Sequence, residues 1–363
     1  MSIEKTFKPY IVNSGGYKGG KSVQELSKGK KIYKLSSNEN ILGSALENDE
    51  LSNHDLNIYP NPTPEDLYRA LERFYNNELK ASQFVAGNGG SDILQMLVMA
   101  FLDPTTNCII SNPCFGPYKM FSQWMGAEVR DVPLNTPNFS LDIDGILAAI
   151  DDHTRLLFLT SPNNPTGTYI TKGELDRLIP QVPDHVVIVY DEVYYQYVTE
   201  EDYTIGLPYV QSGAHLIAVN SYSKAYGMAG LRIGYAYSSE LITSYLRKVL
   251  RPFLINTVSL SAAITTLENK DFIRHTTSVI TEQRNHLEAQ LDKLGIRHWK
   301  SQGNFVLIKT ELDEVTLTQK MLEHQVMVRP SGNFGAPGCV RITIGDQEAT
   351  ETVISALATI CKK

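Results

Sequence analysis

Three stretches of the chain are almost continuously apolar and then end in polar residues. They are RLLFLTS (155–161), HVVIVYDE (185–192) and HLIAVNSYS (215–223). Runs of this kind are typical of strands that are buried on both faces of a sheet. The pattern therefore predicts a mainly parallel sheet between helices, in which ligands bind beyond the carboxyl ends of the strands.

Other segments have helical spacing. Residues 64–77 place Leu67, Leu71 and Phe74 on one face, which predicts an amphipathic helix. A second helix is expected over 91–102, directly after the glycine-rich turn GNGG. From about residue 259 a long helix-like stretch and mixed short strands indicate a separate, smaller α+β domain. Short strands are also expected at 107–111 and 127–134.

The composition excludes several classes of protein. The chain has 363 residues, 42% of them hydrophobic, which is enough for one large core or two unequal ones. A net charge of -7 argues against nucleic acid as the main partner. No apolar run approaches the ~20 residues of a membrane span, and the start lacks the pattern of a signal peptide. The four cysteines show neither CxxC nor metal-site spacing, so we expect a cytoplasmic protein without a metal site.

Residues with catalytic potential follow the apolar stretches directly. Lys224 follows the strand 215–223, and a lysine at a rigid strand end among hydroxyls and cations can act as a nucleophile and general base. Asp191 ends the preceding apolar run, and Tyr194 lies three residues further on. Judged singly, a solvated lysine, a helix N-cap and a core tyrosine explain them as well. Together they suit a pyridoxal phosphate site, which needs a lysine for the aldehyde and an acid for the ring nitrogen.

Further residues suit the rest of such a site. In SPNNPTG (161–167) two prolines stiffen the turn that presents Asn164, which can donate to the cofactor's phenolate oxygen, as can Tyr194. Phe115 can stack on the ring, although an aromatic residue after a strand is more often part of the core. The start of the helix after GNGG favours a phosphate. The residues expected around that phosphate are Gly90, Ser91, Ser221, Ser223 and Arg232.

Two arginines in the last part of the chain flank a glycine-rich loop. Arg329 and Arg341 lie on either side of PSGNFGAPGC (330–339). Paired arginines suit bidentate binding of a carboxylate or a phosphate, although surface ion pairs are a commoner use of arginine. We interpret them as candidates for the anionic group of a substrate.

Taken together, the motifs resemble those of the class I and II (fold type I) aminotransferases. SYSKAYGMAGLRIGY (221–235) is similar to the family's cofactor-lysine signature, and SPNNPTG and DEVY match its two companion motifs in order. The resemblance covers nearly the whole chain and is closest to the histidinol-phosphate aminotransferases. It is carried there by KLSSNEN, IYPNP, GNGGSD, RPFLINTVS, GNFVLIK, VMVRP and CVRITIGD.

The resemblance implies an α/β, fold type I architecture: a mainly parallel sheet between helices in a large domain, plus a smaller α+β domain. Residues 1–45 would form an N-terminal arm and part of the small domain, 46–258 the large cofactor-binding domain, and 259–363 the small C-terminal domain. It also implies a homodimer, in which Tyr59 reaches the cofactor phosphate of the neighbouring subunit.

The resemblance further implies transfer of the amino group of histidinol phosphate to 2-oxoglutarate. Lys224 would hold pyridoxal phosphate and move the proton, while Asp191 keeps the ring nitrogen charged. Because histidinol phosphate has no carboxylate, its phosphate and a carboxylate of glutamate must use the same cations. Arg341 resembles the family's main anion-binding arginine and Arg329 the second one. The other expected substrate contacts are Asn38 and, in the N-terminal arm, Tyr10 or Tyr17.

The chain departs from the family's pattern at three places. Ile41 stands where proline is common, Asn220 stands where arginine is frequent, and the arm with NSGGYKGG is longer than usual. Alternatives within the enzymes are an aromatic amino-acid aminotransferase and a decarboxylase of threonine phosphate. A pyridoxal phosphate-binding protein without turnover is the alternative from another class.

Overall fold

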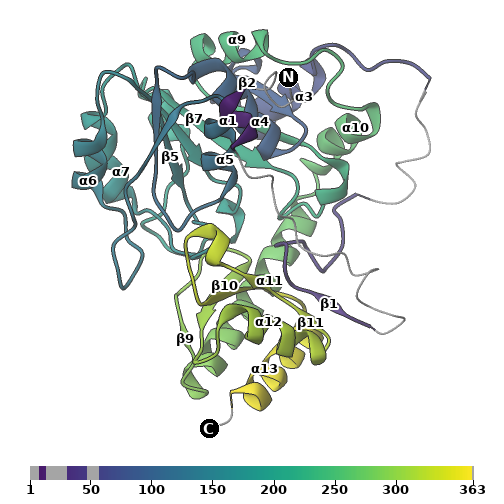
Figure 1. The fold of residues 1–363 in the computed structure, drawn as a ribbon. Helices are drawn as coiled ribbons and strands as arrows, with labels where there is room; N and C mark the ends of the chain where they lie inside the picture. The colour runs from purple at the N-terminus through teal and green to yellow at the C-terminus, as the bar shows by residue number, and fades with distance from the viewer. Residues whose placement is uncertain (1–7, 14–30, 47–56, 362–363) are drawn as a thin grey trace, which may run out of the picture.

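The computed structural model describes residues 8–13, 31–46 and 57–361. A seven-stranded sheet forms the centre of the larger part of the molecule (Figure 1). Its strands are β2 (Phe84–Gly87), β3 (Asn107–Ile110), β4 (Glu128–Asp131), β5 (Thr154–Thr160), β6 (Val187–Asp191), β7 (Leu216–Ser221) and β8 (Gly234–Tyr237). The order is β2-β8-β7-β6-β5-β3-β4, and only β8 runs antiparallel to its neighbours. The predicted parallel sheet is confirmed, and the carboxyl ends of β5, β6 and β7 lie at one edge.

Helices cover both faces of this sheet. Side chains alternate between the two faces along each strand, so Ile188 and Tyr190 of β6 join one apolar cluster, while Val187 and Val189 join the other. The first cluster includes residues of α3 (Glu65–Phe74), α6 (Ile143–Ala149), α7 (Lys172–Leu178), α8 (Leu207–Gln211) and α10 (Thr257–Thr266). The second includes residues of α4 (Gly90–Phe101), α5 (Pro117–Trp124) and α9 (Glu240–Lys248).

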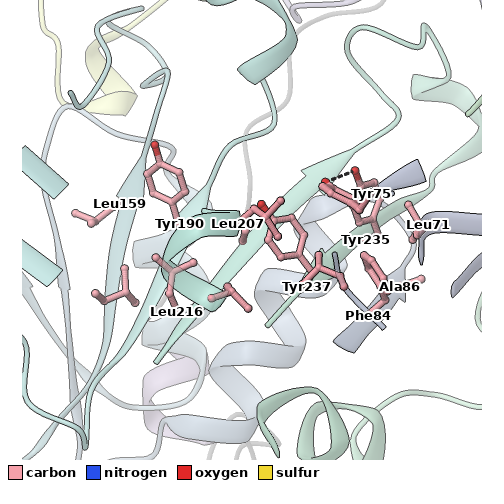
Figure 2. Packing of buried hydrophobic residues seen from close by; sticks show 14 of the residues in the cluster. Leu71, Tyr75, Phe84, Ala86, Leu159, Tyr190, Leu207, Leu216, Tyr235 and Tyr237 are labelled. Atoms are coloured by element: carbon pink, nitrogen blue, oxygen red, sulfur yellow. Dashed lines mark hydrogen bonds between the residues drawn. The ribbon is translucent and has the colours of Figure 1, made fainter. Parts of the chain in front are cut away.

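The first cluster is rich in tyrosine. Figure 2 shows Tyr235 and Tyr237 of β8 beside Tyr75 and Phe84, while Tyr190 of β6 lies further along the sheet, near Leu159. The hydroxyl groups of Tyr75 and Tyr235 lie 3.0 Å apart and form a hydrogen bond inside this core. Buried phenols need such partners, because an unsatisfied hydroxyl costs free energy.

The smaller part of the molecule lies below the sheet in Figure 1 and has its own apolar cluster. An antiparallel sheet has the order β12-β13-β10-β9, and β1 pairs in parallel with β11. The strands are β1 (Tyr33–Lys34), β9 (Arg297–His298), β10 (Phe305–Lys309), β11 (Val326–Met327), β12 (Arg329–Pro330) and β13 (Cys339–Thr343). The helices are α11 (Lys270–Lys293), α12 (Glu314–Glu323) and α13 (Gln347–Ile360).

The chain crosses between the two parts more than once. β1 brings residues 33–34 to the smaller part, beside β11. Most of α10 lies beyond residue 259, yet its Ala262 and Ala263 belong to the core of the larger part. The exact domain boundaries stay predictions. The remaining short helices are α1 (Pro9–Val12), η3 (Ala81–Gln83), η4 (Ile179–Gln181), η5 (Tyr195–Tyr197), η6 (Ala229–Leu231) and η7 (Gly332–Phe334).

Within the described part of the chain, none of the helices has the length and apolar character needed to cross a membrane.

Candidate active site

A cavity of about 340 Å³ lies at the carboxyl ends of β5, β6 and β7. This is the edge where the sequence predicted a ligand, and the volume is in the range of small-molecule sites. Most of the predicted site residues line this one cavity. They are Asn38, Gly90, Ser91, Phe115, Asn164, Asp191, Tyr194, Ser221, Ser223, Lys224, Arg232, Arg329 and Arg341.

Asp191 is the buried acid of the cavity, with a side chain only 5% exposed. Its Oδ2 accepts a hydrogen bond from the hydroxyl of Tyr118 at 2.6 Å, and its Oδ1 accepts one from the backbone N–H of Val193 at 3.3 Å. Burial raises the pKa of Asp191 to about 6, while the two hydrogen bonds and the charge of Lys224 oppose that rise. A cationic partner would stabilise Asp191, because a nearby positive charge favours the ionised form of the carboxyl.

Lys224 follows β7 in the same cavity. Its Nζ lies 3.4 Å from the backbone oxygen of Ser37 and 5.5 Å from the ring centre of Tyr194. Burial, followed by the nearby charge of Arg341, lowers the pKa of Lys224 to about 8, and Glu39 opposes the change. With this pKa, roughly a tenth of the amine is neutral at pH 7, far more than for an ordinary lysine, and the neutral amine is the form that attacks an aldehyde.

Tyr194 is held by Asn38 from the N-terminal segment. Asn38 adopts a positive φ of 53° and donates its Nδ2 proton to the Tyr194 hydroxyl at 3.0 Å. Its Oδ1 accepts from Thr343 at 3.1 Å, which fixes the orientation of the amide. Burial raises the pKa of Tyr194, against the opposing charge of Arg341 and the Asn38 hydrogen bond. The hydroxyl therefore stays protonated and can donate to an oxygen in the cavity.

One end of the cavity is built for an anion. Gly90 and Ser91 begin α4, where unpaired backbone N–H groups attract negative charge. Gly89 has a φ of 82°, and a Cβ there would lie 2.6 Å from Nη2 of Arg232, so only glycine lets the guanidinium approach this turn. Arg232 lies 3.4 Å from the Ser223 hydroxyl through Nη1 and itself has a positive φ of 53°. Ser221 lines the same end.

Arg341 and Arg329 line the cavity from the smaller part of the molecule. They are direct cross-strand neighbours on β13 and β12, where like charges repel unless an anion or other partners compensate. Both guanidinium groups lie within 6 Å of the ring centre of Phe334, at 5.3 Å for Arg329 and 5.7 Å for Arg341. Arg341 also donates to Oδ1 of Asn164 and, at 2.9 Å, to the backbone oxygen of Ser36. The Asn164 side-chain oxygen accepts the bond from Arg341, so the Nδ2 group of the same amide is the one that can donate.

Tyr10 and Tyr59, which were expected at the site, are not among the described residues that line the cavity. Tyr10 packs near Gly126, where a Cβ would lie 3.0 Å from its ring. Tyr59 is 79% exposed, and its ring centre lies 4.9 Å from that of Phe253. Tyr17 lies outside the described residues. Their roles stay predictions.

The sequence analysis missed several residues of the cavity. Tyr118 bonds Asp191 and, at 2.8 Å, Thr160 at the end of β5. A tyrosine in the first turn of the helix after NPCFGP was an available signal, because that helix begins beside the strand ends. The cavity is also lined by Ser36, Ser37 and Glu39, which belong to the same segment as Asn38. Glu39 also pairs with Lys34 at 2.7 Å.

These residues fit pyridoxal phosphate. A buried carboxyl matches its ring nitrogen, an amine of lowered pKa matches its aldehyde, and the α4 cradle matches its phosphate. Phe115 lines the cavity as an aromatic wall. Among the described residues there is no group of three or more His, Cys, Asp or Glu side chains that could hold a metal ion.

Comparison with known proteins decides the family. The family model described as "Aminotransferase class I and II" matches residues 30–357. The chain belongs to the class I and II aminotransferases. It is 35% identical to the histidinol-phosphate aminotransferase of Anoxybacillus flavithermus over 353 residues, which cover 96% of this chain and 94% of that protein. It is 36% identical to the Bacillus subtilis strain 168 protein of the same name, over 91% of this chain and 92% of the relative.

Solved structures of this aminotransferase family share the fold. The histidinol-phosphate aminotransferase from Sinorhizobium meliloti, in complex with pyridoxal-5'-phosphate, matches with a TM-score of 0.83 at 21% identity, over 99% of this chain and 98% of that one. A tetra mutant of the aspartate aminotransferase from Thermus thermophilus matches with a TM-score of 0.83 at 24% identity, covering 98% of this chain and 99% of that one. The predicted fold type I architecture and the transaminase class are therefore confirmed.

Proposed function

We propose that this aminotransferase moves the amino group of histidinol phosphate to 2-oxoglutarate, with pyridoxal phosphate held at Lys224. The observation that carries the proposal is the joint presence, in one cavity, of Lys224, Asp191, the anion cradle of α4 and the paired arginines. The similarity to relatives named histidinol-phosphate aminotransferases supports the choice of substrate.

Pyridoxal phosphate, when bound, supplies an aldehyde for the amino group and a ring that withdraws electrons. Lys224 would bind that aldehyde and, once displaced by the amino donor, would take the proton from the donor's Cα. Asp191 would keep the ring nitrogen protonated, because its burial makes a hydrogen-bonded cation the best partner. Tyr194 and Asn164 would donate to the phenolate oxygen, and Phe115 would stack on the ring.

The two arginines give the cavity a second anion-binding subsite. Arg341, anchored by Ser36 and Asn164, would bind the anionic group common to both substrates. Arg329 is less buried and would add a second cation. A phosphate can accept hydrogen bonds from both arginines, and charge-assisted hydrogen bonds contribute about 1.5–3 kcal/mol each. Asn38 is held between Tyr194 and Thr343 and would shape the contact region of the substrate.

We further propose a cytoplasmic homodimer in which Tyr59 reaches the neighbouring subunit's phosphate site. The exposure of Tyr59, away from the cavity of its own chain, supports a role at an interface. The four unpaired cysteines, three of them buried, support a reducing compartment.

A panel of amino donors tests the reaction. The protein loaded with pyridoxal phosphate would be mixed in single-turnover amounts with histidinol phosphate, phenylalanine or threonine phosphate, followed by 2-oxoglutarate. We expect the fastest loss of the cofactor's visible band with histidinol phosphate, and one equivalent of glutamate. Faster turnover of phenylalanine would support the aromatic alternative, and carbon dioxide from threonine phosphate would support the decarboxylase. Lys224→Ala is the control: it should lack the lysine-linked visible band before any donor is added and should form no glutamate.

A further inference from the structure

Glu192 is a buried acid beside Asp191 that the proposed reaction does not use. It is 0% exposed. Successive residues at a strand end point to opposite faces, so Asp191 contacts Tyr118 of one layer while Glu192 contacts Tyr237 of the other. Tyr237 lies in the tyrosine-rich core of Figure 2. The Glu192 carboxylate therefore lies on the opposite face of the sheet from the carboxyl group of Asp191.

Three donors from three different segments hold this carboxylate. Its Oε1 accepts from Nδ2 of Asn220 on β7 at 2.9 Å and from the hydroxyl of Tyr237 on β8 at 2.8 Å. Its Oε2 accepts from the backbone N–H of Gly206, just before α8, at 2.7 Å. None of the three donors is a cation. The carboxylate is therefore held by neutral donors alone.

We propose that Glu192 is a positioning residue that fixes Asp191 against the ring nitrogen of the cofactor. This inference rests on the proposed pyridoxal phosphate site. The backbone N–H of Glu192 bonds the oxygen of Val219 at 3.1 Å, and the oxygen of Asp191 accepts from Ser161 at 3.0 Å. With Asn220, Tyr237 and Gly206 clamping the side chain, the end of β6 cannot shift or turn without breaking charge-assisted hydrogen bonds.

The clamp also has an electrostatic effect on the site. Burial raises the pKa of Glu192 to about 7; its three hydrogen bonds oppose the rise, and the charge of Asp191 adds to it. The titratable groups that face it are Asp191 on its own strand, Tyr237 on β8, and Tyr75, Tyr190, Tyr195 and Tyr203 around it. Among these, only the two acids titrate near neutral pH. The charge of Glu192 therefore changes within the pH range in which the cofactor site would work.

Glu192→Gln tests the proposal, with Glu288→Gln as the matched control. Glu288 is also buried, at 3% exposure, and accepts a backbone hydrogen bond from Ser301 at 2.9 Å, but it lies on α11 in the smaller part. Affinity for pyridoxal phosphate, the pH midpoint of the visible band and the thermal stability of the unloaded protein would be measured for both. We expect both variants to melt at lower temperature.

Only Glu192→Gln should lower the affinity for pyridoxal phosphate, by about tenfold, which corresponds to the loss of one hydrogen bond to a charged group. It should also move the midpoint of the visible band to lower pH by roughly half a unit, because a nearby negative charge has been removed. Equal affinity and midpoint in Glu192→Gln and wild type would overturn the positioning role.

A milder variant covers the case in which Glu192→Gln does not fold. Tyr237→Phe removes one donor and keeps the core volume, and it should weaken cofactor binding in the same direction by a smaller factor. Unchanged binding in Tyr237→Phe would count against the proposal. Failure of the wild type and of Glu288→Gln to bind pyridoxal phosphate would instead refute the proposed function itself.

Discussion

The hydroxyl of Tyr118 donates to Oδ2 of Asp191 across 2.6 Å, so a residue at the start of α5 controls the protonation of an acid at the end of β6. The same hydroxyl lies 2.8 Å from Thr160 on β5. Burial pushes the pKa of Asp191 upward, and this hydrogen bond is the leading influence against it. The hydrogen bond from Tyr118 on α5 therefore helps to keep Asp191 ionised.

Replacing Tyr118 by Phe should raise the pKa of Asp191 further. A hydrogen bond to a charged group contributes about 1.5–3 kcal/mol, or roughly 1–2 pH units. The pH below which the protein loses pyridoxal phosphate should rise by about that amount, as a titration of the visible band would measure. Tyr169→Phe, which removes another Tyr–Asp bond between residues that do not line the cavity, should leave the titration unchanged. An identical curve for Tyr118→Phe would contradict the prediction.

Lys224 should destabilise the unloaded protein at neutral pH. Its pKa is lowered to about 8 in the folded state, so the unfolded chain binds more protons between pH 8 and 10.5 and stability rises with pH in that window. Lys224→Met should therefore unfold at higher temperature than the wild type at pH 7, by a free energy on the order of 2 kcal/mol. The difference should shrink above pH 10. A variant that is less stable at pH 7 would show that the lysine is not desolvated.

Arg329 should favour phosphate donors specifically. Arg329→Gln removes one of the two cations facing the donor's anionic group, so kcat/KM for histidinol phosphate should fall about 10–100-fold. The value for phenylalanine should change by less than about threefold, since a carboxylate is already bound by Arg341. Arg297→Gln, on β9 over Trp299, is the control. Equal losses with both donors would assign Arg329 a structural role.

Tyr59 should act in the other subunit's site. Tyr59→Ala and Lys224→Ala should each be nearly inactive alone, because one lacks a phosphate contact and the other lacks the amine. Mixed dimers, formed by unfolding and refolding both variants together, should regain activity at the one site that has both residues intact. Sedimentation should give a mass of two chains. No recovery in demonstrably mixed dimers would place Tyr59 outside the partner's site.

The strand ends were predictable from the sequence because burial leaves a clear mark on it. The apolar runs before Asp191 and Lys224 locate two strands, and parallel strands bring their carboxyl ends to one edge. GNGG before α4 marked the anion cradle, since glycine alone allows the close approach of Arg232. Arg329 and Arg341 were candidates because they flank one glycine-rich loop, and the motif resemblance added their separate roles.

What the sequence determined by itself is the mainly parallel sheet and the chemical kinds of residue at the carboxyl ends of its strands, because these depend on local patterns. Only the tertiary structure decided that Tyr118 bonds Asp191, that Asn38 bonds Tyr194 and that Asn220 and Tyr237 hold Glu192. Each of these contacts joins residues at least 28 positions apart in the chain. Such pairs arise from the packing of layers on one another, which leaves no periodic trace along the sequence.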